Sequence, residues 1–474
     1  MSDFELPTPD NTWPESAISA YKALVTVVQE QQELLIKQQE TIQVLTERLN
    51  LNSRNSNKPP SSDRKGKKNS KKRGRKSSSK SRGGQPGHKG TNRKLLEPTE
   101  IIENTPPTKA CVCGEGEWVP RGKIERFQIA ELPKIKPDII EYHIQTYDCS
   151  CCKTACYTGG PNYASQSRFG PRLQSYVIYL SVNARLSMRQ IQANLKDFFG
   201  VSISLGAVSD IIKRGGQLSN PHVCKLKEWF KKDPSPKHVD ETGWRIAGER
   251  AYLIGSLNQY ASVFSITPQK SRFYIEELIG DDISRIIISD RAPQYIAWCS
   301  RQLCWSHVLR TFEFLAESHG SKILGTQLVD CARVLFSSNR DYRAKKISTE
   351  TYVSTAQALR IEVRSLLQQL EGAQRISSLA LSKVTRLLNE EEQLWTFISY
   401  PELPIDNNAQ ERELRIPVIK RKLSFGNDSE EGAARFANIL SVALTLRRQS
   451  RPILDWFNHL FIGNVPSLLP QFKS

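Results

Sequence analysis

Three acidic residues lie where a carboxylate could do chemistry. Asp240 and Asp290 each follow a short apolar run, HVD and RIIISD, that is typical of a buried strand. An ionised acid at the end of such a strand must find a cation, because burying an unpaired charge is costly. Ligands also collect at strand ends in open α/β sheets. Glu411 follows in LPIDNNAQERELR, where Asp406 or Asn407 can cap a helix.

Carboxylate oxygens are hard ligands of the kind that Mg²⁺ or Mn²⁺ prefers. Two such ions about 4 Å apart can activate a hydroxyl or water and stabilise the leaving oxygen in an in-line displacement at phosphorus. The Glu411 stretch is also densely basic, with Arg415 one turn further on and Pro417 expected to stop or kink the helix. A lone acid among arginines is usually half of a solvated ion pair, which is the interpretation this stretch favours by itself. The two acids upstream favour the catalytic interpretation instead.

The elements that must position these acids form an α/β pattern from Pro236 onward. We expect a strand that ends at Asp240, two more strands separated by a turn at 257–259, a buried strand before Asp290, and a helix from Ala292 to Ser300. The acids would then lie on separate elements of one core.

The gap between the second and third acids is too long for one strand–helix step. Residues 311–395 are rich in Leu, Gln, Arg and Glu with little Gly or Pro, which predicts an inserted helical subdomain. The catalytic core would therefore comprise residues 234–310 and 396–450, with 451–474 as a C-terminal tail.

The charge of the chain indicates the class of molecule that it binds. Its 474 residues are enough for several domains, and their formal net charge is +18. An excess this large indicates a polyanion. We expect DNA and no membrane, because no run of eighteen or more apolar residues, signal peptide or lipidation motif accompanies the charge.

Much of the excess lies in residues 52–95. Between Arg64 and Arg82 there are eleven Lys or Arg and no acid. Such a composition cannot build a core, which predicts a largely disordered segment. A solubilising linker is one interpretation, and we prefer a DNA-binding arm because its cations are unopposed. The candidate phosphate-binding residues of this arm are Arg64, Lys65, Lys67, Lys68, Lys71, Lys72, Arg73, Arg75 and Lys76.

A heptad pattern precedes the arm. In residues 16–51 one seam position is apolar at every repeat, and Gln31 and Gln38 interrupt the other. The pattern predicts a short coiled coil and hence self-association, with a helix packed on its own domain as the alternative. The apolar seam residues are Tyr21, Val28, Leu35, Ile42 and Leu49 in one position and Leu24 and Leu45 in the other.

A cysteine-rich module is expected at residues 100–160. Cys111 and Cys113 form one knuckle, and Cys149 and Cys152 form a second beyond a strand-rich stretch. Together they resemble a zinc ribbon, although the first knuckle is C-x-C instead of C-x-x-C. Four zinc ligands and a set of reduced cysteines on a small β element both remain open. The chain as a whole fits a reduced, cytoplasmic environment.

Residues 168–220 have the spacing of a helix-turn-helix. A helical stretch is followed by a turn at Gly200 and by a second helix that Ser204 can cap. We expect the recognition helix at about Leu205 to Arg214.

Several blocks of the chain resemble the insertion-sequence-66 family of bacterial DDE transposases, and the resemblance extends over nearly the whole length. These blocks are NSNKPPSSD (55–63), GGQPGHKG (83–90), HVDETGWR (238–245), ISDRAPQY (288–295), QLCWSHVLR (302–310) and DNNAQERELR with RKLSFG (406–426). The compressed C-x-C knuckle and the Pro-Gln pair within ISDRAPQY depart from the family pattern.

The resemblance implies a ribonuclease-H-like core in which Asp240, Asp290 and Glu411 are the catalytic acids and hold Mg²⁺ or Mn²⁺. It also implies an N-terminal zipper, a basic arm and a cysteine knuckle region, in the order found here. The expected fold is therefore multidomain, with an α/β ribonuclease-H-like catalytic core and an all-helical insertion. A coiled coil, a disordered basic arm, a small cysteine-rich β module and a helical DNA-binding region would precede the core.

The resemblance also implies partners and roles. The partners would be DNA ends and target DNA, a second copy of the chain and small companion proteins, in the bacterial cytoplasm near the nucleoid. Cys304 and His307 form a C-x-x-H pair. Two ligands do not make a zinc site, so we expect a structural role that orients the active-site helix. Basic residues expected at DNA phosphates near the reaction are Arg310, Arg412, Arg415, Lys420, Arg421 and Lys422.

Two other functions fit parts of this pattern. A catalytically silent DNA-binding regulator would keep the arm and the helix-turn-helix without using the acids. A metal-dependent nuclease without joining activity would use the acids but would have no need of a coiled coil to pair DNA ends.

Overall fold

The computed structural model divides the chain into two units, residues 1–63 with 140–474, and residues 64–139, and each is considered by itself. The basic-arm residues from Arg64 to Lys76 lie outside the described part of the chain. Among the described residues, no helix has both the length and the apolar character that a membrane span requires. The described residues are 13–56, 95–103, 107–109, 111–116, 118–119, 122, 124, 126–143, 145–157, 167–298 and 300–470.

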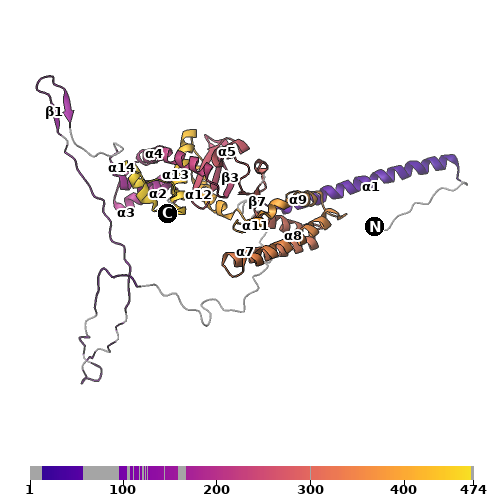
Figure 1. Ribbon diagram of the computed structural model, residues 1–474, viewed down its shortest axis with the longest axis horizontal. Helices are drawn as coiled ribbons and strands as arrows, with labels where there is room; N and C mark the ends of the chain where they lie inside the picture. Colours follow the sequence, from indigo (N-terminus) through magenta and orange to yellow (C-terminus); the bar gives the residue numbers. More distant parts are fainter. Residues whose placement is uncertain are drawn as a thin grey trace. The chain divides into compact units, whose positions relative to one another are not determined.

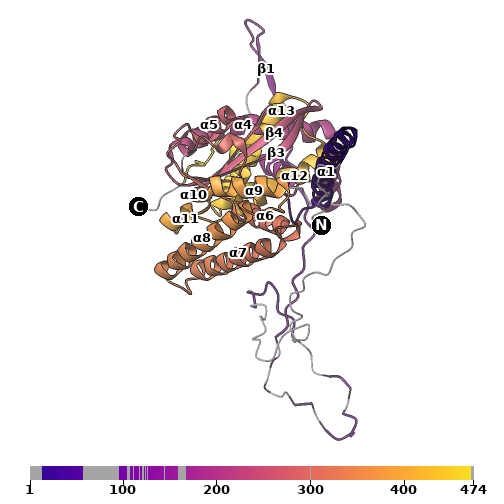
Figure 2. The same cartoon turned by 90° about the vertical axis from the view of Figure 1, so that its right-hand side faces the viewer.

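A five-stranded mixed sheet forms the centre of the larger unit. Its strands are β3 (Lys237–Ile246), β4 (Glu249–Leu257), β5 (Ser262–Thr267), β6 (Ile287–Ser289) and β7 (Arg301–Leu303), in the order β5-β4-β3-β6-β7. The first three pair antiparallel, and β3 and β4 lie side by side in Figure 2. Strands β6 and β7 continue the sheet in parallel with β3. The sheet is therefore an antiparallel meander extended by two parallel strands.

The sequence pattern predicted that β3 ends at Asp240, and this prediction was wrong. The strand pairs with β4 as far as Ile246, and the two strands reverse at Ala247 and Gly248, which both have positive φ. A two-residue turn of this kind matches the twist of an antiparallel hairpin. The full-length pairing with β4 therefore keeps the chain extended beyond the acid. The expected turn between β4 and β5 is present: residues 258–261 join the two strands, with hydrogen bonds between Asn258 and Ala261.

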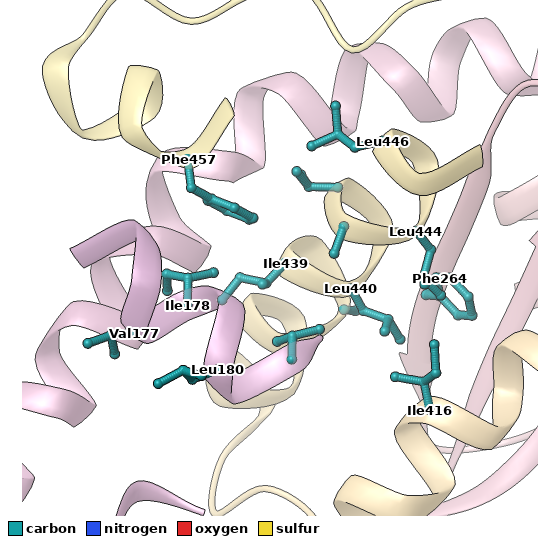
Figure 3. Packing of buried hydrophobic residues seen from close by; sticks show 14 of the residues in the cluster. Val177, Ile178, Leu180, Phe264, Ile416, Ile439, Leu440, Leu444, Leu446 and Phe457 are labelled. Atoms are coloured by element: carbon teal, nitrogen blue, oxygen red, sulfur yellow. The ribbon is translucent and has the colours of Figure 1, made fainter. Parts of the chain in front are cut away.

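The sheet has a different helical cover on each face. On one face, α4 (Leu205–Lys232) and α5 (Arg272–Ile279) bury Val239, Ile254 and Ile287. On the other, α12 (Asn408–Ser424) and α13 (Glu430–Arg448) pack on alternate residues such as Trp244 and Leu253. Figure 3 shows the core between α13, β5, α12, α2 (Pro171–Val182) and α14 (Ile453–Ile462), with labelled residues that include Ile178, Phe264, Ile416, Leu440 and Phe457.

Helix α13 also caps the edge of the sheet. Ser441 accepts a hydrogen bond from the backbone of Phe264, and the Thr445 hydroxyl both accepts from and donates to the backbone of Ser262. An exposed edge strand offers unpaired N–H and C=O groups to other chains. These two buried hydroxyls therefore satisfy backbone groups on the free edge of β5, which α13 covers.

Helices α2 and α3 (Met188–Phe199) precede α4. Gly200 ends α3 in a left-handed conformation, and the Ser204 side chain caps α4, both where the sequence indicated. Helix α4 does not end near Arg214 but continues to Lys232. One face of α4 is buried from Val208 to Phe230. It packs mainly on α13 and α2, and on the sheet near its C-terminal end, and this packing extends the helix beyond the predicted segment.

The helices expected between residues 311 and 395 are present. Helices α7 (Lys322–Arg343) and α8 (Thr349–Glu371) lie side by side (Figure 1). Helix α6 (Trp305–Glu317) packs against α7 and α9 (Ser378–Asn389) against α8, and the core of these helices includes Phe312, Leu328, Leu367 and Trp395. This helical stretch consists of α6 (Trp305–Glu317), α7 (Lys322–Arg343), α8 (Thr349–Glu371), α9 (Ser378–Asn389), α10 (Glu391–Leu394) and, just beyond, α11 (Thr396–Ser399).

One further local prediction was wrong, and one of the two outcomes predicted for Pro417 does not occur. The expected helix from Ala292 to Ser300 is only the 3₁₀ turn η2 (Pro293–Tyr295), because Ser300 must accept a β-ladder hydrogen bond from Ile287 just before β7. Pro417 does not stop its helix, since α12 continues to Ser424. Pro417 is buried, and packing on the sheet outweighs the backbone hydrogen bond that a proline cannot make.

The N-terminal helix α1 (Glu15–Asn50) matches the predicted heptad segment. Hydrogen bonds tie its last turns and the segment that follows it to the rest of the unit: the Ser377 hydroxyl donates to Glu47, and Asn55, beyond the helix, donates to Glu317. Further along the chain, β1 (Thr146–Asp148) and β2 (Ala155–Tyr157) form a small hairpin.

Candidate active site

The sheet brings Asp240 and Asp290 level with each other. His238 of β3 lies opposite Ile288 of β6 in parallel register, and each aspartate follows two residues later on its own strand. Parallel neighbours are about 4.8 Å apart, and side chains two residues apart point to the same face. Val239 belongs to the core under α4 and α5. The two carboxylates therefore lie on the opposite face, which α12 covers.

Helix α12 supplies the third acid, and Asn407 fixes where that helix begins. The Asn407 side chain accepts from His238 Nδ1 at 2.8 Å and donates to the Val239 carbonyl at 2.9 Å. Its backbone N–H contacts Cys304 Sγ at 3.2 Å, and its carbonyl accepts from the N–H of Glu411. The start of α12 is thus pinned to β3 one residue before Asp240. The predicted cap differs in detail, because Asp406 accepts from the N–H of Asn408, while the Asn407 side chain makes no capping bond.

The acids affect one another electrostatically. Burial raises the pKa of Asp240 well above its usual range, and the nearby Glu241, Asp290 and Glu411 carboxylates raise it further, against a lowering hydrogen bond from the backbone N–H of Glu241. A cluster of like charges on a partly buried surface favours either protons or cations. The three predicted acids therefore lie within electrostatic reach of each other, in a site that would gain from a positive ion.

Glu411 also lies close to Cys304 and His307, which sequence reasoning did not predict. Its Oε1 atom is buried, has no hydrogen-bond partner among the described residues, and lies 3.8 Å from His307 Nε2. One ligand atom each of Cys304, His307 and Glu411 lies within 4.8 Å of the other two. Burial raises the pKa of the Cys304 thiol to about 12. Cys304 and Glu411 are far apart in the chain, so local spacing gave no sign of this contact.

Sequence reasoning also missed Glu241. Its carboxylate accepts hydrogen bonds from Tyr295 at 2.5 Å and Gln294 at 2.6 Å and pairs with Lys270 at 3.4 Å. Burial raises its pKa. Alternation along β3 directs Glu241 away from Asp240, toward η2, where it holds the chain just after Asp290. The pair of adjacent acids in HVDETGWR is the sequence feature that could have identified Glu241.

The basic residues around α12 divide into two groups. Arg412 and Arg415 are exposed and free to meet an anion. Arg421 is half-buried and donates to the Thr242 hydroxyl at 3.4 Å. Lys420 is turned inward, where its ammonium donates to the Leu186 carbonyl at 2.6 Å and burial lowers its pKa to about 8. Lys420 thus joins α12 to the segment after α2 instead of facing solvent.

The cysteine knuckles fall in different units. Cys111 and Cys113 belong to the smaller unit, where backbone N–H groups and the Cys111 thiol lower the pKa of Cys113. Cys149 and Cys152 lie at the turn of the β1–β2 hairpin, where Thr154 and then Cys149 lower the pKa of Cys152 to about 7. Each pair is individually suited to metal binding, because a thiolate is the metal-binding form. A zinc ion shared by the four remains a prediction.

Comparisons with known proteins assign a family to the part of the chain that holds the acids. Residues 7–94 match a family model of unknown function, DUF6444. An uncharacterized protein of Sinorhizobium fredii, y4jO, is 27% identical over 172 residues, which are 36% of this chain and 50% of that protein. The chain thus spans about half the length of this curated relative. Residues 166–435, which include the sheet, the helical stretch and all three acids, match the model described as "Transposase IS66 family". The chain belongs to the IS66 transposase family.

Proposed function

We propose that the protein is a DNA transposase that binds the ends of its element, cleaves them and joins the 3′ hydroxyls to target DNA. The observation that supports this most is that Asp240 and Asp290 lie level on neighbouring strands and that Glu411 is near enough to raise the pKa of Asp240, within a chain of the IS66 family. The antiparallel meander with two added parallel strands is the arrangement expected of a ribonuclease-H-like core, and we assign that fold to it.

The donor set fits divalent cations. Two aspartates and a glutamate with an unpartnered buried oxygen supply the hard ligands that Mg²⁺ or Mn²⁺ prefers. Such ions, when bound, would activate the attacking oxygen and stabilise the leaving one. The chain's own contribution is to hold the carboxylates. Asn407 fixes α12 against β3, and Glu241 fixes the segment after Asp290 through Tyr295.

Substrate binding would rest on positive charge outside the acid cluster. Arg412 and Arg415 on α12 lie near the acids and are free to bind backbone phosphates. The eleven cations between Arg64 and Arg82 would add affinity that does not depend on DNA sequence. Pairing two ends calls for a homo-oligomer, which α1 is suited to provide. Companion proteins, a zinc-bound cysteine module and a nucleoid location belong to the same proposal.

The decisive variant is Asp240→Asn, which removes one ligand charge and keeps the side-chain shape. We expect end-DNA binding to stay within about twofold and Mg²⁺-dependent cleavage to fall by roughly a thousandfold or more, since metal ligation contributes several kcal/mol to the transition state. Folding should not suffer, because a neutral side chain relieves the repulsion around Asp240. The exposed Asp281→Asn is the matched control and should cleave normally.

The same assay separates the two rival functions. A silent regulator would bind end DNA and cut nothing in either the parent or the variant. A nuclease without joining activity would cut in the parent but give no strand-transfer product with target DNA. An Asp240→Asn protein that still cleaves would remove this residue from the catalytic machinery.

A further inference from the structure

The contact between Glu411 and the C-x-x-H pair goes beyond the arrangement of the acids. Cys304 is the residue that caps α6 and His307 lies in its first turn, so the start of this helix carries both side chains. Glu411 reaches them from the first turn of α12. A thiol, an imidazole and a carboxylate are thereby collected from two helices whose starts are joined by the Asn407–Cys304 contact.

These three groups have free ligand atoms and the geometry of a site. Cys304 is almost fully buried. Glu411 Oε1 is buried without a hydrogen-bond partner among the described residues, and His307 Nε2 lies 3.8 Å from it, beyond hydrogen-bond distance. Unpaired buried polar atoms are costly and call for an explanation such as a bound ion. The backbone N–H of Asn407 that contacts Cys304 Sγ is the kind of outer contact that orients a metal-bound sulfur.

The distances favour a small tetrahedral ion. Metal–ligand bonds of 2.0–2.3 Å at tetrahedral angles place ligand atoms about 3.3 to 3.8 Å apart. His307 and Glu411 are already 3.8 Å apart, and all three groups lie within 4.8 Å. Closing the set therefore requires shifts of about 1 Å, within the reach of side-chain rotation. Sulfur and nitrogen donors select zinc over magnesium, which prefers oxygen.

We propose that Cys304, His307 and Glu411 form a zinc site that shares its glutamate with the catalytic acids. Three protein ligands leave a fourth position open for water. Zinc at this site would hold Glu411 on the α6 side and withdraw it from Asp240 and Asp290. The consequence for activity rests on the proposed function, so zinc would inhibit cleavage by competing for Glu411. Metal binding itself does not depend on that function.

Cobalt is the probe for binding, because thiolate-bound Co²⁺ absorbs in the near ultraviolet and visible. The full chain and its Cys304→Ser and His307→Gln variants would be titrated with Co²⁺ without DNA or Mg²⁺. The knuckle cysteines contribute equally to all spectra and cancel in the differences. We expect each parent-minus-variant difference spectrum to show a thiolate–cobalt band that disappears when zinc is added. Cys331→Ser, which changes a buried cysteine elsewhere in the fold, should keep the band.

The outcomes are separable from those of the cleavage test. Asp240→Asn should keep the cobalt band while losing cleavage, because Asp240 belongs only to the magnesium set. In cleavage assays, Cys304→Ser should raise the half-inhibitory zinc concentration at least about tenfold. Identical cobalt spectra for the parent, Cys304→Ser and His307→Gln, each with a native circular dichroism spectrum, would overturn the zinc site and leave the transposase proposal untouched.

Discussion

Asn407 shows how one uncharged side chain can decide where an acid lies. It is fully buried, and its amide links the ring of His238 with the carbonyl of Val239, while its backbone meets Cys304. In the sequence, Asn407 is one of two candidate caps in a polar stretch. Its actual partners are distant in the chain, so spacing could indicate the start of α12 but not the strand on which that helix is fixed.

Replacing Asn407 with alanine should therefore damage both stability and activity. The His238 ring and the Val239 carbonyl would be left buried without partners, at about 1–3 kcal/mol each. We expect the Tm of the core transition to fall by about 5–10 °C, with cleavage reduced further because Glu411 is no longer held. Calorimetry and end cleavage measure the two effects. The exposed Asn389→Ala is the control, and equal Tm values for the two variants would show that the Asn407 network contributes nothing.

Residue types revealed the acids but not their surroundings. Asp240 and Asp290 could be found because an apolar run before each acid is a local pattern, and the parallel register of β3 and β6 then brings them level. The His307–Glu411 pair and the Tyr295–Glu241 hydrogen bond join segments that only the folded sheet brings together. Sequence reasoning therefore identified the candidate ligands and missed the residues that orient them.

At the scale of elements, the sequence predicted a helix end, turn or strand correctly where adjacent residues determine it. The cap at Ser204, the turn at Gly200 and the strand before Asp290 all follow from a few adjacent residues. The predictions failed where a neighbouring element decides. Strand β3 is extended by its pairing with β4, and α12 passes through Pro417 because that residue is packed in the core.

The packing of α12 on β4 depends on a glycine. A Cβ atom at Gly255 would lie 2.3 Å from Gln410 Nε2 and 2.6 Å from the ring of Phe264. Gln410 is the buried residue just before Glu411. The absence of a side chain on β4 therefore lets the acid-bearing turn of α12 approach the sheet.

Gly255→Ala should push this turn outward. Overpacking of a core typically costs about 1–3 kcal/mol, and we expect that loss in urea unfolding together with a fall in cleavage of at least about tenfold, because Glu411 moves with Gln410. Gly206→Ala is the matched control, since a Cβ there meets only Ser204 Oγ at 3.9 Å and a helical alanine is favoured. If Gly255→Ala cleaved as well as Gly206→Ala, the position of this turn would not limit catalysis.

For the molecule as a whole, α1 is the element whose apolar residues are left exposed in a single copy of the chain. The alternative of a helix packed on its own domain fits only its end, where Glu47 and Asn55 are bound. Further back, Leu24, Leu35 and Ile42 of the seam are each more than half exposed. A run of exposed apolar residues at heptad spacing is stable only when a partner covers it, and a second α1 has the matching pattern.

We therefore expect the full chain to dimerise through α1, and Leu35→Glu to weaken that association by about a thousandfold. Each partner would lose a buried leucine worth about 2 kcal/mol, and each 1.4 kcal/mol is a factor of ten. Sedimentation equilibrium measures the change, with Lys37→Glu, which lies off the seam, as the control of equal charge sign. Cleavage at a single end should survive in Leu35→Glu, whereas joining of paired ends should be lost. A Leu35→Glu protein that sediments like the parent would mean that copies of this chain meet through another surface.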